Sequence, residues 1–269
     1  MTVRLKPIHR DKWSGGGANL FRNLEYAEAV APHAFDEDGL PVLASNIAPP
    51  NLLRTGEFVH IPQNAWAWHG SAVGAWELRR RTLLRLGSEI TCRRAAISIR
   101  IGPMIPSYAR TAQEFLPNVL DLDFEDALHS KGEAALPFDF DDAPYWIVPG
   151  SLWSYRNVGA VLEAYNNRRP RFKDWKLLLI GPLSTESGLR GLMAEQHDGV
   201  VIHTERVARS EMLAAIAGSS GCIFPSVVEA SPVTVLEAAA LNVPLIAWRT
   251  PAHEYICKSA GIDLSLIHI

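Results

Sequence analysis

The stretch FPSVVEASPVTVLEAAALNVPLIAW, residues 224–248, decides how we interpret the fold of the second half of the chain. It starts in an apolar strand, turns, continues as an apolar helix and ends in a second apolar strand. Ser231 is a good helix N-cap, and Pro232 suits the first helical turn. The two glutamates of the stretch, Glu229 in the turn and Glu237 in the helix, therefore need an explanation.

Strands and helices alternate with short loops from residue 145 to residue 248. This alternation predicts a parallel, doubly wound sheet with right-handed crossovers. In such sheets, ligands bind beyond the carboxyl ends of the strands. The loops that follow the predicted strands are Gly150–Arg156, Gly181–Ser187, Thr204–Ser210 and Ser226–Pro232.

The first half gives weaker signals of the same kind. Val3–Ile8 is typical of a short strand, and the glycines Gly15, Gly16 and Gly17 lead into a helix-like run. Further strands are predicted over residues 40–45, 57–63 and 93–101, with a helix over 77–91.

An acidic segment at residues 131–144, broken by Gly and Pro, predicts a linker. We therefore expect an N-terminal α/β domain over residues 1–130 and a second α/β domain over residues 145–263. Residues 264–269 carry no turn signal after Gly261 and are interpreted as a non-native tail, in which case the second domain is incomplete at its C-terminus.

The bulk composition narrows the class of protein. With 269 residues and 48% hydrophobic content, the chain is large enough for two domains. The 26 basic and 29 acidic residues give a net charge of −3, and scattered basic residues argue against nucleic acid as a partner. Three widely spaced cysteines favour a reducing, cytoplasmic setting, and the histidines show no metal-ligand spacing, so we predict no metal.

The helix after Ser231 explains part of the pattern. Its N-terminal N–H groups point toward the strand ends, where a diphosphate is favoured by hydrogen bonds and by the helix dipole. A carboxylate at Glu237 needs donors, which ligand hydroxyls, an arginine of the same domain or solvent would supply. For Glu229, a solvated loop charge and a functional role remain equally open.

The same stretch resembles the signature of the retaining glycosyltransferases of family four, the group 1 transferases. Its pattern has two glutamates at the spacing of Glu229 and Glu237. Three further segments also resemble that family, namely FLPNVLD (115–121), PGSLWSYRNVGAVLEAY (149–165) and LLLIGP (177–182). The resemblance implies a GT-B fold, in which two Rossmann-like doubly wound domains face a cleft.

The resemblance also implies roles for residues. Glu237 would bind the ribose of a nucleoside diphosphate sugar, and Glu229 would lie against the donor sugar. Arg156 would neutralise the leaving phosphate. The helix start, Ser231 to Val233 with Pro232 between them, would hold the diphosphate, next to the glycine loop at Gly150 and Ser151. No cofactor is implied, because the nucleotide sugar is a substrate.

Some positions depart from the family pattern. Ser151 replaces an arginine, so leaving-group charge rests more on Arg156. In the first domain, Gly15–Gly17 resembles an acceptor-side glycine loop, and Gln63 and Asn64 stand where many members carry a His-Asp pair.

Two further features of the first domain have ordinary structural readings. The tryptophans Trp66, Trp68 and Trp76 are more typical of a core or an interface than of a sugar-stacking site. A solvated helix face is the simpler reading of Arg79–Arg81, with an acceptor at a membrane surface as the alternative.

We therefore expect a retaining glycosyltransferase that moves a sugar from a nucleoside diphosphate to a hydroxyl of a saccharide or glycoconjugate. We expect it in the cytoplasm, with peripheral contact at the inner face of the membrane left open. Two alternatives remain: a catalytically silent nucleotide-sugar binding protein, and a non-hydrolysing sugar-nucleotide epimerase of GT-B fold. A glycosidase is disfavoured, because its two carboxylates must flank the scissile bond.

Overall fold

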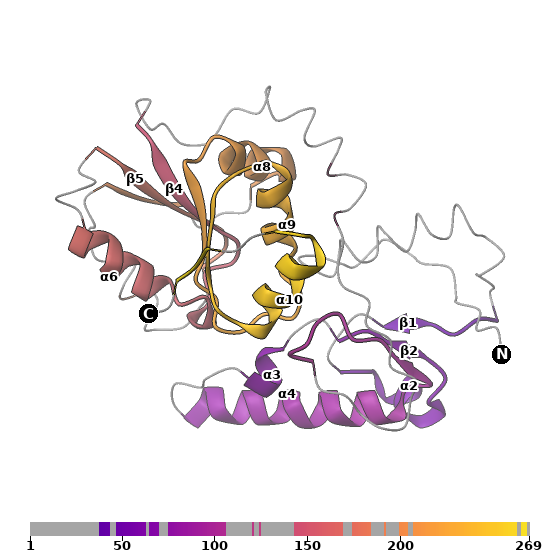
Figure 1. Cartoon of the computed structure of the whole chain (residues 1–269). Helices are drawn as coiled ribbons and strands as arrows, with labels where there is room; N and C mark the ends of the chain where they lie inside the picture. Colours follow the sequence, from indigo (N-terminus) through magenta and orange to yellow (C-terminus); the bar gives the residue numbers. More distant parts are fainter. Residues whose placement is uncertain are drawn as a thin grey trace. The chain divides into compact units, whose positions relative to one another are not determined.

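The computed structural model divides into two compact α/β units (Figure 1). The first comprises Met1–Leu122 with Val228–Val233, and the second comprises Asp123–Val227 with Thr234–Ile269. The structure describes residues 38–43, 47–62, 65–69, 75–105, 120, 124, 143–168, 174–183, 191, 199–203, 207–262 and 265–267. The predicted strand Val3–Ile8 and nearly all of the predicted linker lie outside these residues.

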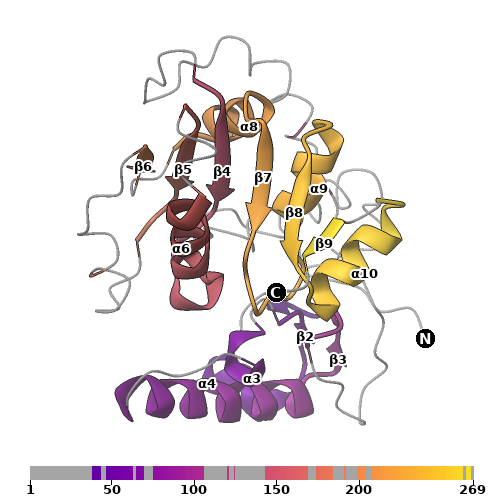
Figure 2. The same cartoon turned by 60° about the vertical axis from the view of Figure 1, so that its left-hand side comes forward.

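The second unit is built on a parallel sheet of six strands, as the alternation predicts (Figure 2). Their order across the sheet is β6-β5-β4-β7-β8-β9, and every neighbouring pair is parallel. The strands are β4 (Tyr145–Pro149), β5 (Lys176–Ile180), β6 (Val200–His203), β7 (Gly221–Phe224), β8 (Leu245–Trp248) and β9 (Ser265–Ile267).

Helices lie on both faces of this sheet. The chain runs from β4 to β5 in one direction across the sheet and from β7 to β8 in the other. Because crossovers between parallel strands are right-handed, the helices of these two connections cover opposite faces. The helices are the 3₁₀ turn η2 (Ser154–Arg156), α6 (Val158–Arg168), α8 (Arg209–Ala217), α9 (Val233–Ala240) and α10 (Pro251–Ser259).

Alternate side chains of the strands enter two different cores, because successive residues of a strand point to opposite faces. Ile147 of β4 packs in the cluster that includes Ile216 of α8 and Val235 of α9. Its neighbour Val148 packs in the other cluster, with Leu162 of α6. The central strands are therefore apolar on both faces, as buried parallel strands must be.

The structure corrects three details of the predicted elements. Helix α9 starts at Val233, two residues after the predicted cap Ser231. Helix α10 was not predicted, although Thr250 accepts a hydrogen bond from the His253 N–H and Pro251 begins the helix. Residues Ser265–Ile267, in the predicted tail, pair with β8 as a sixth strand.

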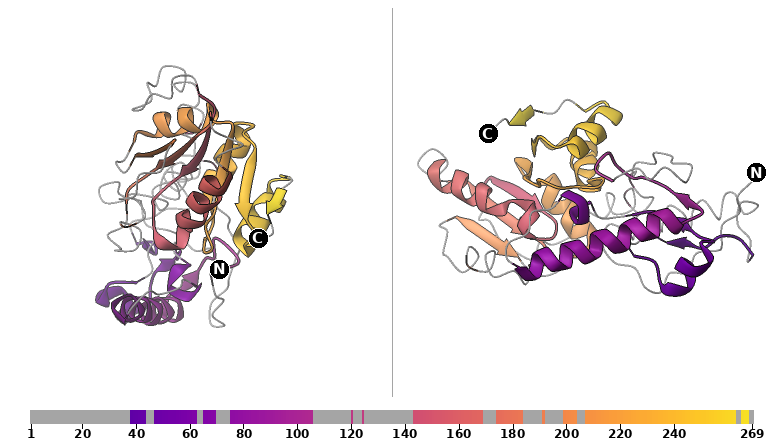
Figure 3. Two further views of the ribbon diagram at one scale, coloured as in Figure 1. Left: turned by 90° about the vertical axis from the view of Figure 1, so that its left-hand side faces the viewer. Right: turned by 90° about the horizontal axis from the view of Figure 1, so that it is seen from below.

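The first unit contains a smaller parallel sheet of three strands in the order β1-β2-β3. Phe58, which directly precedes β2, packs with Ala48 and Ala95 in its core. The long helix α4 lies between β2 and β3 in the chain. It is the long purple helix of Figure 3. The elements are β1 (Val42–Leu43), α2 (Pro50–Thr55), β2 (Val59–His60), α3 (Trp66–His69), α4 (Ala75–Arg94) and β3 (Ile97–Ser98).

Candidate functional site

Two glycines bring the carboxyl ends of β4 and β5 together. Gly150 follows β4 with φ +101°, and Gly181 follows β5 with φ +145°, a backbone region that disfavours other residues. A Cβ atom added to Gly181 would lie 2.2 Å from the Gly150 carbonyl oxygen and 3.1 Å from the Ser151 nitrogen. The missing side chain at Gly181 therefore lets the loops after β4 and β5 pack backbone against backbone at the strand ends.

Arg156 lies against this backbone. A Cβ atom added to Gly150 would lie 3.7 Å from Arg156 Nη2, so the guanidinium faces the glycine. Arg156 Nη1 also donates a hydrogen bond of 3.2 Å to the hydroxyl of Ser226, a fully buried side chain beyond the end of β7. The Val227 N–H donates to the Tyr155 carbonyl at 3.0 Å, which ties the loop after β7 to η2. The fold thus holds a positive charge at the carboxyl ends of β4 and β7.

Glu237 forms an ion pair with an arginine of the same unit. Its side chain is buried in the second turn of α9, and its Oε1 lies 2.8 Å from Nη1 of Arg209, the first residue of α8. The sequence left three hydrogen-bond donors open for this carboxylate: ligand hydroxyls, an arginine of the same domain, or solvent. The structure shows the arginine. A carboxylate has about four acceptor positions, so the ion pair is compatible with further donors from a ligand.

Burial near Glu237 raises the pKa values of two neighbouring side chains, Cys222 and Tyr145. Burial raises the pKa of the Cys222 thiol on β7, and the negative charge of Glu237 raises it further. Burial, followed by the effect of Cys222, raises the pKa of Tyr145 to about 12. The Tyr145 hydroxyl donates a hydrogen bond of 2.7 Å to the Ala215 carbonyl. Cys222 and Tyr145 are thus neutral, structural groups at ordinary pH.

The remaining predicted donor-site residues lie between β7 and α9. Glu229 is half-buried between the buried residues Val228 and Ala230. Ser231 and Pro232 directly precede α9, and Val233 is its first residue. Residues 228–233 group with the first unit, whereas Arg156 and Glu237 belong to the second.

Several predicted residues lie outside the described part of the chain. These are the glycine loop Gly15, Gly16 and Gly17 and the pair Gln63 and Asn64. Their assignment to the acceptor side or to the donor sugar stays a prediction.

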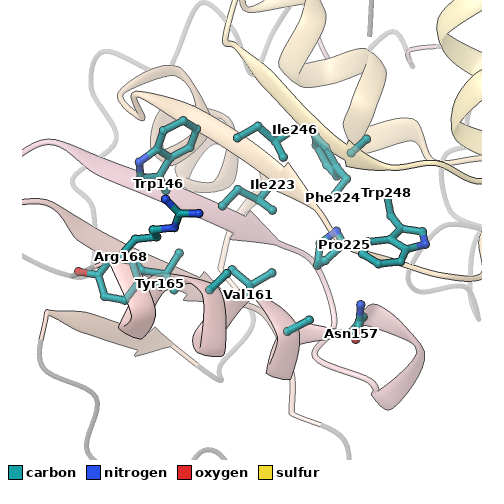
Figure 4. Close-up of a pocket in the computed structure, with 14 residues that line it drawn as sticks. Trp146, Asn157, Val161, Tyr165, Arg168, Ile223, Phe224, Pro225, Ile246 and Trp248 are labelled. Atoms are coloured by element: carbon teal, nitrogen blue, oxygen red, sulfur yellow. The ribbon is translucent and has the colours of Figure 1, made fainter. Parts of the chain in front are cut away.

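An apolar groove of about 350 Å³ lies between α6 and the sheet of the second unit (Figure 4). Trp146 and Trp248 lie at its two ends, with Val161 on the α6 side and Ile223 on the sheet side. Arg168, from the last turn of α6, is the charged residue of its wall. An apolar wall is poorly suited to a diphosphate, so the groove is not our candidate for the donor site.

Three residues of the candidate site were not singled out from the sequence: Gly181, Arg209 and Ser226. Each falls in one of the four loops that follow the predicted strands, which was the available signal. Their pairing with Gly150, Glu237 and Arg156 depends on contacts between distant segments.

The described residues contain no cluster of three or more His, Cys, Asp or Glu side chains suited to a metal ion. Within the same residues, no helix is long and apolar enough to cross a membrane.

Two α/β units, each with a parallel sheet, are the architecture of a GT-B fold. Solved structures of that fold match nearly the whole chain. Trehalose-6-phosphate synthase OtsA matches with a TM-score of 0.58 and 10% identity, over 92% of this chain and 65% of that one. The glycosyltransferase WaaG of lipopolysaccharide biosynthesis matches with a TM-score of 0.51 and 14% identity, over 93% and 70%.

A third structure, trehalose-6-phosphate from E. coli bound with UDP-2-fluoro glucose, matches with a TM-score of 0.57 and 9% identity, over 92% of this chain and 66% of that one. Residues 143–265 match the family described as glycosyl transferases group 1. No curated protein sequence matches the chain. The chain spans 65% of the length of OtsA.

Proposed function

We propose that the chain acts in glycosyl transfer from a nucleoside diphosphate sugar to an acceptor hydroxyl, with retention at the anomeric carbon. The observation that carries the proposal is the Arg156 guanidinium, held by buried Ser226 against Gly150 at the strand ends. The family of residues 143–265 and the nucleotide sugar bound in the E. coli neighbour support it.

In the proposed reaction, the bond between the anomeric carbon and the β-phosphate oxygen breaks, and the nucleoside diphosphate leaves. The acceptor oxygen bonds to the same face of the anomeric carbon, and its proton passes to the departing phosphate. Negative charge grows on that phosphate, where fixed positive groups give most of the stabilisation. Arg156 supplies this charge, together with the backbone N–H groups at Ser231 and Val233.

The other proposed site residues bind different parts of the nucleotide sugar. Glu237 accepts hydrogen bonds from the ribose hydroxyls while Arg209 holds its carboxylate in place. Glu229 lies by the donor sugar, and Gly150 and Ser151 lie by the diphosphate. The acceptor is a saccharide or glycoconjugate. The reaction uses no cofactor and no metal.

Replacing Arg156 tests the proposal. The donor is first chosen from a binding panel of nucleoside diphosphate sugars. With that donor, Arg156→Ala should raise the activation free energy of transfer by about 2 to 4 kcal/mol and so lower kcat. Donor affinity should change much less, because the charge develops only in the transition state. Steady-state kinetics and donor titration measure the two quantities separately.

Arg168→Ala is the matched control, since Arg168 lines the apolar groove and not the strand-end cluster. A loss confined to donor affinity in Arg156→Ala would contradict the proposed role. Donor binding without transfer to any acceptor would favour the silent binding protein. Conversion of the donor to its epimer without acceptor would favour the epimerase.

A further inference from the structure

The guanidinium of Arg156 has an aromatic neighbour in addition to Ser226 and the backbone of Gly150. Its Cζ atom lies over the Tyr155 ring, 5.7 Å from the ring centroid. That distance is within the range of a cation–π contact, in which the negative face of an aromatic ring attracts a positive charge. The guanidinium therefore contacts three segments of the second unit: the loop after β4, the 3₁₀ turn η2 and the loop after β7.

The ring of Tyr155 is itself held by its neighbours. Trp153 stacks on it, with the ring centroids 6.5 Å apart and an angle of 19° between the ring planes. The Tyr155 carbonyl accepts a hydrogen bond of 3.0 Å from the Val227 N–H. The Arg156 N–H donates a hydrogen bond of 2.9 Å to the Trp153 carbonyl. Both the backbone of η2 and the aromatic side chain beside Arg156 are thus restrained.

A restrained guanidinium matters because Arg156 is proposed to act on a charge that develops only in the transition state. Arginine is long and has many rotamers, so a loosely held side chain would have to be ordered during the reaction. A positive group that already points at the developing charge costs no reorganisation at that moment. The hydrogen bond to Ser226 fixes one nitrogen, whereas the Tyr155 ring attracts the charge of the whole group.

We propose that Tyr155 is a positioning residue for the transfer reaction, and that its ring holds the Arg156 guanidinium at the carboxyl ends of the strands. This inference rests on the proposed function of Arg156. The ring, and not the hydroxyl, is the part that acts, because the ring makes the contact with the guanidinium. Trp153 supports Tyr155 through the stacking contact.

Steady-state kinetics of the whole chain test this role, with the same donor as for Arg156→Ala. Tyr155→Leu should lower kcat by about three- to thirtyfold, which is the loss expected when a cation–π contact is removed. The KM for the donor should change by less than about twofold, because the ring acts through a charge that is needed mainly in the transition state. Tyr155→Phe keeps the ring and should retain nearly all of the wild-type kcat.

A double-mutant cycle with Arg156 separates positioning from a direct contact of Tyr155 with the substrate. In the Arg156→Ala background, Tyr155→Leu should have little further effect on kcat, because that chain has no guanidinium to position. An equal fold-loss in both backgrounds would overturn the proposal. So would a loss in Tyr155→Phe as large as that in Tyr155→Leu.

Tyr165→Leu is the matched control. Tyr165 lies on α6 and lines the apolar groove, and its hydroxyl donates a hydrogen bond of 2.7 Å to the Trp175 carbonyl. With kcat expressed per folded chain, and the folded fraction taken from urea unfolding, this change should leave kcat at the wild-type value. A loss equal to that in Tyr155→Leu would overturn the proposal, because it would reflect a general disturbance of the second unit.

Nuclear magnetic resonance of the chain without donor gives a readout that does not depend on transfer. The order parameter of the Arg156 Nε–Hε bond should be high in the wild type and in Tyr155→Phe, and it should fall in Tyr155→Leu. Equal order parameters in the wild type and Tyr155→Leu would overturn the proposal. If the order depends on Tyr155 but the wild-type chain transfers no sugar, the positioning contact holds and the proposed function fails.

Discussion

At the scale of single residues, the ion pair between Glu237 and Arg209 changes how the ribose assignment must be tested. Removing either partner takes this ion pair away from a charge that lies in a largely buried position. Loss of nucleotide affinity in Glu237→Ala alone would therefore not separate a ribose contact from a structural ion pair.

We predict that Glu237→Ala and Arg209→Ala each lower the free energy of unfolding by about 2 to 3 kcal/mol. In addition, the wild-type chain should prefer a nucleoside diphosphate over its 2′,3′-dideoxy form, and Glu237→Ala should abolish this preference. Arg209→Ala should retain most of it. Urea unfolding and calorimetric titration measure these effects, and a preference that survives in Glu237→Ala would exclude the ribose role.

At the scale of elements, the loops after β4 and β5 depend on two glycines in close contact. We predict that Gly181→Ala lowers the free energy of unfolding by about 2 kcal/mol or more, because its Cβ would meet the Gly150 carbonyl and its φ is positive. Since the same backbone faces Arg156, turnover should fall as well. Thermal unfolding and kinetics measure both effects.

Gly191→Ala is the control for this change. No atom lies within 4 Å of a Cβ added at Gly191, which is in helical conformation. This change should be neutral or stabilising by less than about 1 kcal/mol. Equal losses at the two glycines would show that the contact between the β4 and β5 loops is unimportant.

At the scale of the whole molecule, buried neutral acids make the fold sensitive to alkali. Burial raises the pKa of Cys92 and of Cys257 from 9.0 to about 11, and that of Tyr145 from 10.0 to about 12. In each case the folded state holds its proton at a pH where the unfolded chain loses it. The contribution of these three protonated groups to the free energy of unfolding is complete below pH 9.0. It is lost as the pH rises from 9.0 through about 12.

We therefore predict a lower free energy of unfolding at alkaline pH than at neutral pH. Urea unfolding across this pH range should show the decline, and Tyr145→Phe should make its upper part shallower. Tyr145→Phe also removes the hydrogen bond to the Ala215 carbonyl and should cost about 1 kcal/mol at neutral pH. A pH-independent free energy of unfolding would contradict the burial of these groups.

The sequence by itself determined the parallel sheet of the second unit, because apolar strand runs and helical runs alternate there with short loops. Right-handed crossovers then leave few possible strand topologies. It also located the four loops that supply Gly150, Arg156, Gly181, Arg209 and Ser226. It missed α10, whose Thr250 cap is a short local signal, and it did not predict a strand at Ser265–Ile267.

Only the tertiary structure decided which loop residues meet. Arg156 and Ser226 are 70 positions apart, and no local pattern encodes their hydrogen bond. Likewise, periodicity shows that α4 has apolar positions, but packing against the rest of the first unit decides which of them stay exposed. Pairing and exposure are properties of contacts between distant segments, and these exist only once the sheet has formed.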